Sequence, residues 1–241
     1  MQEKPFVFFD LGQTLVSEWD FINHFDSKFL ELLNGFGARI DMRNYKAVRD
    51  SIIRDRGIGH GSVRELIVEV CKAVLPAGYG QAILERIEPE IKEGRMTLFR
   101  FAEGAEQVLQ SLSVRCDLGI IANQSEDILG LLSSSSFEKY FKVKTISGVA
   151  KLKKPNPAIF QLALKEAGRE AGVGCIMVGD RLDTDICPAN RLGMSTVRVI
   201  DSLFALQQPR EECELATRTA IRLLKVPRAV EEILAQNGKD R

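Results

Sequence analysis

Short apolar runs recur along the chain and predict the strands of a parallel sheet. These runs are nearly continuous in hydrophobic residues, which is typical of strands covered on both faces. The expected strands are 6–9 (FVFF), 118–122 (LGIIA), a segment around 145–147, 175–178 (CIMV) and 196–200. Helical patterns separate them at 104–112, 126–132, 157–167 and 185–192. Strands that alternate with helices predict a doubly wound α/β domain.

A different pattern fills the stretch between the first and second strands. It consists of helix after helix, and the first helix has an apolar stripe of residues Phe21, Phe25, Phe29 and Leu33. We expect that helix to open at Ser17, where Asp20 completes a capping box. The sequence therefore predicts an α/β core made of residues 1–15 and 98–241, with an inserted all-helical cap domain at 16–97. Beyond Asp201 further helical segments are expected, the last starting near Pro227.

Polar residues follow three of the predicted strands directly. Asp10, Asn123 and Asp180 each come immediately after an apolar run. In doubly wound sheets the ligand site lies beyond the carboxyl ends of the strands. These positions are therefore the first candidates for a functional site.

Composition and charge narrow the class of function. The chain has 241 residues, and Lys+Arg and Asp+Glu are equal at 33 each, so no overall field favours nucleic acid or an anionic membrane. Small-molecule chemistry is the default. The five cysteines form no C-x-x-C pair, which favours a reducing compartment. The first apolar run is too short for a signal peptide or membrane span, and we expect a cytoplasmic protein.

Four segments, in order, resemble the motifs of the haloacid dehalogenase superfamily. They are FVFFDLGQTL at 6–15, IIANQS at 120–125, KKPNPAIF at 153–160 and VGDRLDTDI at 178–186. The resemblance spans the chain from Phe6 to about Ile200, and the helical insert resembles the C1 caps of that superfamily. It implies a Rossmannoid core and a Mg²⁺-dependent phosphohydrolase that acts on a small phosphorylated metabolite.

The resemblance assigns the carboxylates. Asp10 would attack phosphorus to form an aspartyl-phosphate. A carboxylate that approaches a phosphate dianion is repelled unless a divalent cation neutralises both, and Mg²⁺ prefers carboxylate, carbonyl and water oxygens. Asp10, Asp180 and the main-chain carbonyl of Gly12 would be the protein ligands of Mg²⁺, and Asp185 would orient metal-bound waters.

The remaining motif positions concern the phosphate. Lys154 matches the family's lysine, which balances the charge of the nucleophile and of a phosphoryl oxygen. Lys151 and Lys153 are close enough to compete, and the Lys-Pro dipeptide favours Lys154. Thr14 would bond the Asp10 loop or the phosphate, and Gln13 or a cap residue would position the water. Asn123 and Ser125 are both candidates for a donor to the phosphate.

Three positions depart from the family pattern. Gly12 stands where phosphatases of the family carry a general acid, Gln13 where Gly is usual, and Ala122 where a hydroxyl is expected. Losing general acid–base help costs a factor of roughly 10²–10⁴ in rate. Three functions therefore stay open: a phosphatase of reduced power or of substrates with good leaving groups, a binding or regulatory module, and a metal-independent 2-haloacid dehalogenase.

Other conspicuous residues receive structural interpretations. Asp183 is expected to cap a helix, and His60 to lie in the turn that Gly57–Gly61 makes. Arg49, with its neighbours Arg54 and Arg56, is expected on a solvated charged face.

Overall fold

A six-stranded parallel sheet forms the centre of the larger unit. The computed structural model describes residues 4–98 and 100–238, apart from the side chains of residues 95 and 96. The strand order is β5-β4-β1-β6-β7-β8, and each neighbouring pair is parallel. The strands are β1 (Phe6–Phe9), β4 (Asp117–Ala122), β5 (Phe141–Ile146), β6 (Cys175–Gly179), β7 (Ser195–Val199) and β8 (Arg218–Ala220). The predicted doubly wound α/β fold is confirmed.

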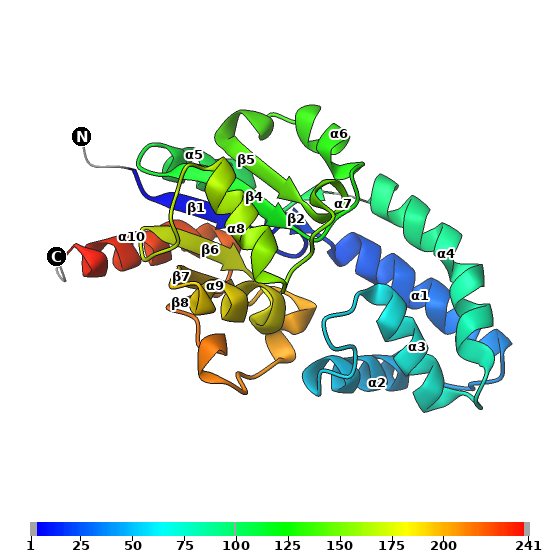
Figure 1. Cartoon of the computed structure of the whole chain (residues 1–241). Helices are drawn as coiled ribbons and strands as arrows, with labels where there is room; N and C mark the ends of the chain where they lie inside the picture. Colours follow the sequence, from blue (N-terminus) through cyan, green and yellow to red (C-terminus); the bar gives the residue numbers. More distant parts are fainter. Residues whose placement is uncertain (1–3, 99, 239–241) are drawn as a thin grey trace. The chain divides into compact units, whose positions relative to one another are not determined.

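Helices cover both faces of this sheet (Figure 1). On one face α5 (Ala105–Ser113) packs on β4, and α10 (Val226–Asn237) packs on β7 and β8. On the other, α8 (Pro157–Glu166) packs on β4 and β5, and α9 (Cys187–Arg191) packs on β7. Phe6, Phe8 and Met177 point toward α8 and form a buried cluster with its Ile159 and Phe160. Such burial is the main favourable term that holds the layers together.

The expected strands are all present, with small shifts at their ends. The expected strand around 145–147 lies at Phe141–Ile146, and Ser147 instead begins the short helix α7 (Ser147–Ala150). Beyond Asp201 the expected helical segments are present, and α10 begins at Val226. The strand β8 in the same stretch was not predicted. Only three residues long and without an apolar run, β8 carries no strand signal in the sequence. Short helical turns flank it: η3 (Leu203–Leu206), η4 (Glu212–Glu214) and η5 (Leu223–Lys225).

The chain divides into two compact units. One comprises the residues up to Val16, Phe101–Ala205 and those from Pro209 onward; the other comprises Ser17–Arg100 and Leu206–Gln208. The division after Val16 and Arg100 differs little from the expected 15/16 and 97/98. Leu206–Gln208, expected in the core, instead groups with the helical unit. There Gln207 is fully buried and its Nε2 donates to the carbonyl of Ile53 at 3.2 Å.

The helical unit contains α1 (Trp19–Gly35), α2 (Met42–Arg54), α3 (Val63–Val74) and α4 (Tyr79–Thr97). Two short paired strands, β2 (Val16–Ser17) and β3 (Arg100–Phe101), lie where the chain passes from one unit to the other. The expected capping box at Ser17 is not formed, because α1 starts after Glu18 without a side-chain cap. The box that does form, Ser62 with Glu65, opens α3.

The expected solvated position of Arg49 is also wrong. Its guanidinium is buried and donates to Asp26 on α1 and, at 2.8 Å, to Asp50. The hydroxyl of Tyr45 donates to the other oxygen of Asp26 at 2.7 Å, and its pKa is raised by burial and by that carboxylate. A buried charge is tolerated when it is paired and hydrogen-bonded in this way.

The cysteines do not all stay reduced. Cys187 and Cys213 form a disulfide, whereas Cys71, Cys116 and Cys175 are free and buried. The reduced state expected of the cysteines is therefore wrong for this pair. None of the described helices has both the length and the apolar character that crossing a membrane requires, and the cytoplasmic location stays a prediction.

Candidate active site

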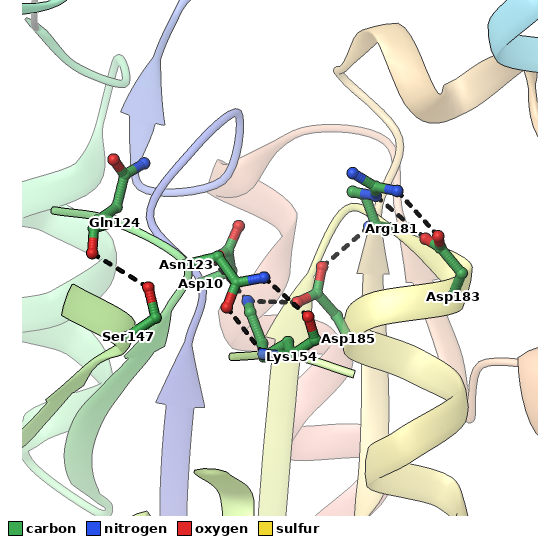
Figure 2. A network of polar contacts seen from close by, with 8 residues as sticks. All are labelled: Asp10, Asn123, Gln124, Ser147, Lys154, Arg181, Asp183 and Asp185. Carbon is green, nitrogen blue, oxygen red and sulfur yellow. Dashed lines mark hydrogen bonds and ion pairs between the residues drawn. The ribbon is translucent and has the colours of Figure 1, made fainter. Parts of the chain in front are cut away.

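The site is built at the carboxyl ends of the three central strands. Because β1 lies between β4 and β6, the residues that follow these strands come together, as Figure 2 shows for Asp10 and Asn123. The backbone N–H of Asp10 continues the sheet pairing by donating to the carbonyl of Val178 at 2.8 Å. These residues therefore lie at the carboxyl edge of the sheet, where the sequence predicts them.

Lys154 joins two of the predicted acidic residues. Its Nζ donates to Asp10 Oδ1 at 2.7 Å and to Asp185 Oδ1 at 2.5 Å (Figure 2). The side chain is only 2% exposed. Burial by itself lowers the pKa of this amine, but the charges of Asp10 and Asp185 outweigh it and raise the pKa. Lys154 is therefore a permanent cation in the site, and the alternatives Lys151 and Lys153 are exposed.

Asn123 positions the backbone of Lys154. Its Oδ1 accepts from the backbone N–H of Lys154 at 2.8 Å, and its Nδ2 donates to the Lys154 carbonyl at 2.9 Å. Both ends of the amide thus contact one backbone, beside the cis Lys154–Pro155 bond. The amide nitrogen carries a second N–H, and the contact of Asn123 with phosphate stays a prediction.

Three carboxylates converge beside this lysine. One oxygen each of Asp10, Asp180 and Asp185 lies within 4.8 Å of the others. Asp180 is 2% exposed and its Oδ2 has no hydrogen-bond partner among the described residues. Burial and the charges of the other two acids raise the pKa of Asp180, and burial raises that of Asp185 to about 6 despite Lys154.

This cluster fits a small divalent cation. Among the described residues, the amine of Lys154 is paired with two of the three acidic groups, Asp10 and Asp185. The unpaired buried oxygen of Asp180 is costly without a partner. Carboxylate oxygens are the ligands that Mg²⁺ prefers. The residues present therefore suit the metal that the sequence predicts.

The fourth motif reaches the cluster through an unusual turn. Residues Leu182–Ile186 form a single π-helical turn, η2, in which the N–H of Ile186 bonds the carbonyl of Arg181 at 3.2 Å. The N–H of Arg181 also donates to Asp185 Oδ2 at 3.0 Å, which leaves Oδ1 for Lys154. Widened turns of this kind are frequent at functional sites. The Arg181 N–H and the Lys154 side chain thus fix the two oxygens of Asp185.

Asp183 does not cap a helix as expected. It lies inside η2, where its two oxygens accept from the Nε and Nη2 of Arg181 at 3.0 and 2.8 Å (Figure 2). The same guanidinium lies over the ring of Phe204, 4.3 Å from its centroid. The sequence does not indicate a role for Arg181. In the structure it connects the fourth motif to η3.

The loop after Asp10 carries the remaining predicted residues. Gln13 has a left-handed backbone, φ 52°, and its Oε1 accepts from the N–H of Leu203 at 2.7 Å. It therefore binds the loop to η3 through its Oε1, and its expected contact with phosphate or water stays a prediction. Thr14 is buried and its hydroxyl has no partner among the described residues, so it stays available for one. The backbone of Gly12 bridges to Val16, and its role as a ligand stays a prediction.

The comparison with known families settles the membership. A family model described as haloacid dehalogenase-like hydrolase matches residues 7–199. The chain belongs to this family. The matched range contains every predicted site residue and the helical insert, so this haloacid dehalogenase-like hydrolase is an enzyme with the family's core from β1 to β7.

Two relatives of this hydrolase are named for the hydrolysis of small phosphate esters. It is 26% identical over 204 residues to a glyceraldehyde 3-phosphate phosphatase of Methanocaldococcus jannaschii, covering 82% of this chain and 86% of the relative. It is 27% identical over 198 residues to the pyrimidine 5'-nucleotidase YjjG of Escherichia coli, covering 79% and 83%. The HAD-hydrolase YfnB of Bacillus subtilis, solved with magnesium bound, shares the fold with a TM-score of 0.65, 18% identity and coverage of 95% and 99%.

Two site residues of this hydrolase had no sequence signal. Ser202 lies beside Asp180 and favours its charged form, which partly offsets the rise in the pKa of Asp180 that burial causes. Buried Arg198 donates from Nε to the Asp180 carbonyl at 3.4 Å and from Nη2 to the Phe204 carbonyl at 2.7 Å. Both act on the segment after Asp180 and lie outside the four motifs.

A substitution at Gly179 tests how tightly the cluster is packed. A Cβ at this position would lie 2.5 Å from Cγ of Asp185, which Lys154 and the Arg181 N–H hold in place. We expect Gly179→Ala to destabilise the fold by about 1–3 kcal/mol, as overpacking does, and to reduce activity. Thermal unfolding measures the effect. Gly130→Ala is the matched control, because nothing lies within 4 Å of its added methyl group, and equal melting temperatures of the two variants would contradict the prediction.

The acidic cluster also predicts a pH-dependent response to metal. The pKa of Asp185 is about 6 in the folded chain, against about 3.9 for an unfolded aspartate. Protonation of Asp185 therefore stabilises the metal-free fold at low pH, and this stabilisation is lost as the pH rises through about 6. The raised pKa of Asp180 changes the stability of the fold in the same direction. Since a cation binds the deprotonated acids, Mg²⁺ should raise the melting temperature more at about pH 7.5 than at about pH 5.

Differential scanning fluorimetry with EDTA or Mg²⁺ at both pH values measures this response. Asp180→Asn should remove most of the Mg²⁺ shift, because it neutralises the carboxylate whose oxygen has no partner. An equal or larger Mg²⁺ shift at the lower pH would show that these acids do not bind the ion.

Proposed function

We propose that this chain is a Mg²⁺-dependent phosphatase that acts on a small phosphorylated metabolite through an aspartyl-phosphate on Asp10. The observation that carries the proposal is the pairing of Lys154 with Asp10 and Asp185 beside the unpartnered oxygen of Asp180. This arrangement balances one nucleophilic carboxylate with an amine and leaves acidic oxygens for a cation. The names of the relatives, a phosphatase and a nucleotidase, support the same class of substrate.

The metal would be held by Asp10, Asp180 and the carbonyl of Gly12, with Asp185 beside them. When bound, Mg²⁺ supplies positive charge that offsets the repulsion between a carboxylate and a phosphate dianion. A metal-independent dehalogenase has no use for such an acidic cluster, which argues against this alternative.

The chain's own residues account for the transfer. An oxygen of Asp10 attacks phosphorus, the ester P–O bond breaks, and the electron pair leaves with the alcohol oxygen. Lys154 donates hydrogen bonds to Asp10 and Asp185, and its positive charge offsets the charge of the phosphoryl oxygens. The free hydroxyl of Thr14 is available as a further donor. Water then hydrolyses the acyl phosphate and releases inorganic phosphate and Asp10.

Proton transfer is the weak step of this site. Gly12 has no side chain to protonate the departing oxygen, and general acid help is worth a factor of roughly 10²–10⁴. Asn123 and Gln13 are engaged in hydrogen bonds to backbone groups. Phosphates whose leaving group has a conjugate acid of low pKa, such as aryl and anomeric phosphate esters and acyl phosphates, are therefore the expected better substrates.

A substrate panel tests the proposal. The purified chain is assayed for phosphate release with Mg²⁺ or with EDTA, using para-nitrophenyl phosphate, acetyl phosphate, glucose 1-phosphate, glyceraldehyde 3-phosphate and pyrimidine 5'-nucleotides. We expect Mg²⁺-dependent release, faster from the aryl and acyl phosphates than from unactivated alkyl esters. No release from any compound, combined with a Mg²⁺-dependent thermal shift, would show a binding module in place of an enzyme.

A further inference from the structure

The disulfide between Cys187 and Cys213 lies directly beside the candidate active site. Cys187 is the first residue of α9 and follows the π-helical turn η2, two positions after Asp185. Cys213 lies in η4, a segment that packs against both α9 and η2. The bond thus fastens the end of the fourth motif to a loop separated from it by 26 residues.

This pair differs from the other cysteines of the chain. Cys71, Cys116 and Cys175 are buried and unpaired, and burial raises the pKa of each thiol. Thiols of that kind are inert toward exchange. Cys213, in contrast, is partly exposed and lies between exposed Glu212 and buried Glu214. Reagents in solvent therefore reach Cys213 more easily than any other cysteine in the described part of the chain.

Other contacts keep the two cysteines close when the bond is broken. The Nδ2 of Asn190 on α9 donates to the carbonyls of Cys213 and Leu215 at 2.8 and 2.9 Å. An exposed ion pair joins Arg191 and Glu211 at 2.8 Å. The Cα atoms of the pair are 4.4 Å apart, within the range that disulfides require. The local structure therefore permits the bond to reform without rearranging the chain.

We propose that Cys187 and Cys213 form a reversible thiol–disulfide exchange site that tunes the neighbouring active site. A dithiol reductant attacks the sulfur of Cys213 through one thiolate, and the S–S bond breaks with its electron pair on Cys187, which takes up a proton. The second thiol of the reductant then attacks the mixed disulfide and releases Cys213 as a thiol. The two cysteines gain two electrons and two protons, and the reductant becomes a disulfide.

The link to activity is the position of Asp185. Its two oxygens are set by Lys154 and by the N–H of Arg181, and its segment is anchored at its far end by Cys187. Reduction removes the covalent anchor and leaves the hydrogen bonds of Asn190. We expect turnover of the reduced protein to fall by a factor of up to about 10², the loss that a misplacement of about 1 Å can cause.

The test is a redox titration of the full chain. The protein is equilibrated with fixed ratios of reduced and oxidised dithiothreitol, and each sample is divided. One half is denatured in the presence of a chelator and alkylated, and its mass is measured by mass spectrometry. The other half is assayed with para-nitrophenyl phosphate. We expect three alkylated thiols at the oxidised end and five at the reduced end, with activity following the same curve. The activity part rests on the proposed function, whereas the thiol count does not.

Two variants sharpen the result. Cys213→Ser should have the activity of the reduced protein at every ratio, and the control Cys116→Ser, in a buried site, should follow the wild-type curve. Five alkylated thiols at every ratio would overturn the exchange site. A titrating thiol count with constant activity would overturn its link to turnover. If no phosphate ester is hydrolysed, the proposed function fails, and the thiol count with thermal unfolding of both redox states still decides whether the exchange site exists.

Discussion

Replacing Lys154 by methionine is expected to reduce phosphatase turnover by about 10²–10³, the loss typical of removing one preorganised donor. Methionine keeps the length of the side chain and removes the charge that meets both Asp10 and Asp185. Because the remaining carboxylates are buried, the fold should also lose roughly 3–5 kcal/mol, as when one partner of a buried pair is removed. Steady-state kinetics and chemical denaturation measure the two effects.

Lys153→Met is the matched control for this experiment. Lys153 precedes Lys154 and is exposed, so removal of its charge should change neither turnover nor stability appreciably. If the two variants had the same turnover, the ammonium between the acids would not take part in the reaction. A Lys154→Arg variant adds a check, since a planar guanidinium does not replace a compact ammonium between two carboxylates.

Substitution of Asp10 by asparagine should lower turnover by at least about 10³, because it removes the nucleophile and keeps the shape of the side chain. The Oδ1 of asparagine can still accept from Lys154, as that of Asp10 does. The melting temperature without metal is therefore expected to stay close to that of the wild type. Acid-quenched samples of the wild type, incubated with acetyl phosphate, should contain a phosphorylated peptide that includes residue 10, and the variant should contain none.

Asp127→Asn provides the comparison, since this aspartate is exposed and lies outside the acidic cluster. It should keep wild-type turnover. Turnover of the Asp10→Asn variant within about tenfold of the wild type, with no labelled peptide in either protein, would exclude Asp10 as the nucleophile.

The positions of the acidic residues could be predicted because they depend on local patterns. Asp10 and Asp180 each follow a buried strand, and the order of strands in doubly wound sheets brings such ends together. The contact of Lys154 with Asp10 joins residues 144 positions apart. It was found only through the resemblance of its motif to a family, and no periodicity in the chain indicates it.

Pairings between distant polar groups could not be predicted. Arg49 has the surroundings of a surface residue in sequence, yet Asp26, 23 positions earlier, makes its burial tolerable. The amide of Asn123 is satisfied by a backbone 31 residues away. The disulfide of Cys187 lacks any spacing signature. In each case the partner is supplied by tertiary structure, which overrides what neighbouring residues suggest.

The membership of Leu206–Gln208 in the helical unit limits how this enzyme can be re-engineered. The chain passes between the two units at four points, after Val16, Arg100, Ala205 and Gln208. A deletion of Ser17–Arg100, or its exchange for the cap of a relative, would strip buried Gln207 of the Ile53 carbonyl that its amide requires. A functional chimera of this protein therefore has to transplant both pieces together, as a discontinuous module rather than a simple insertion.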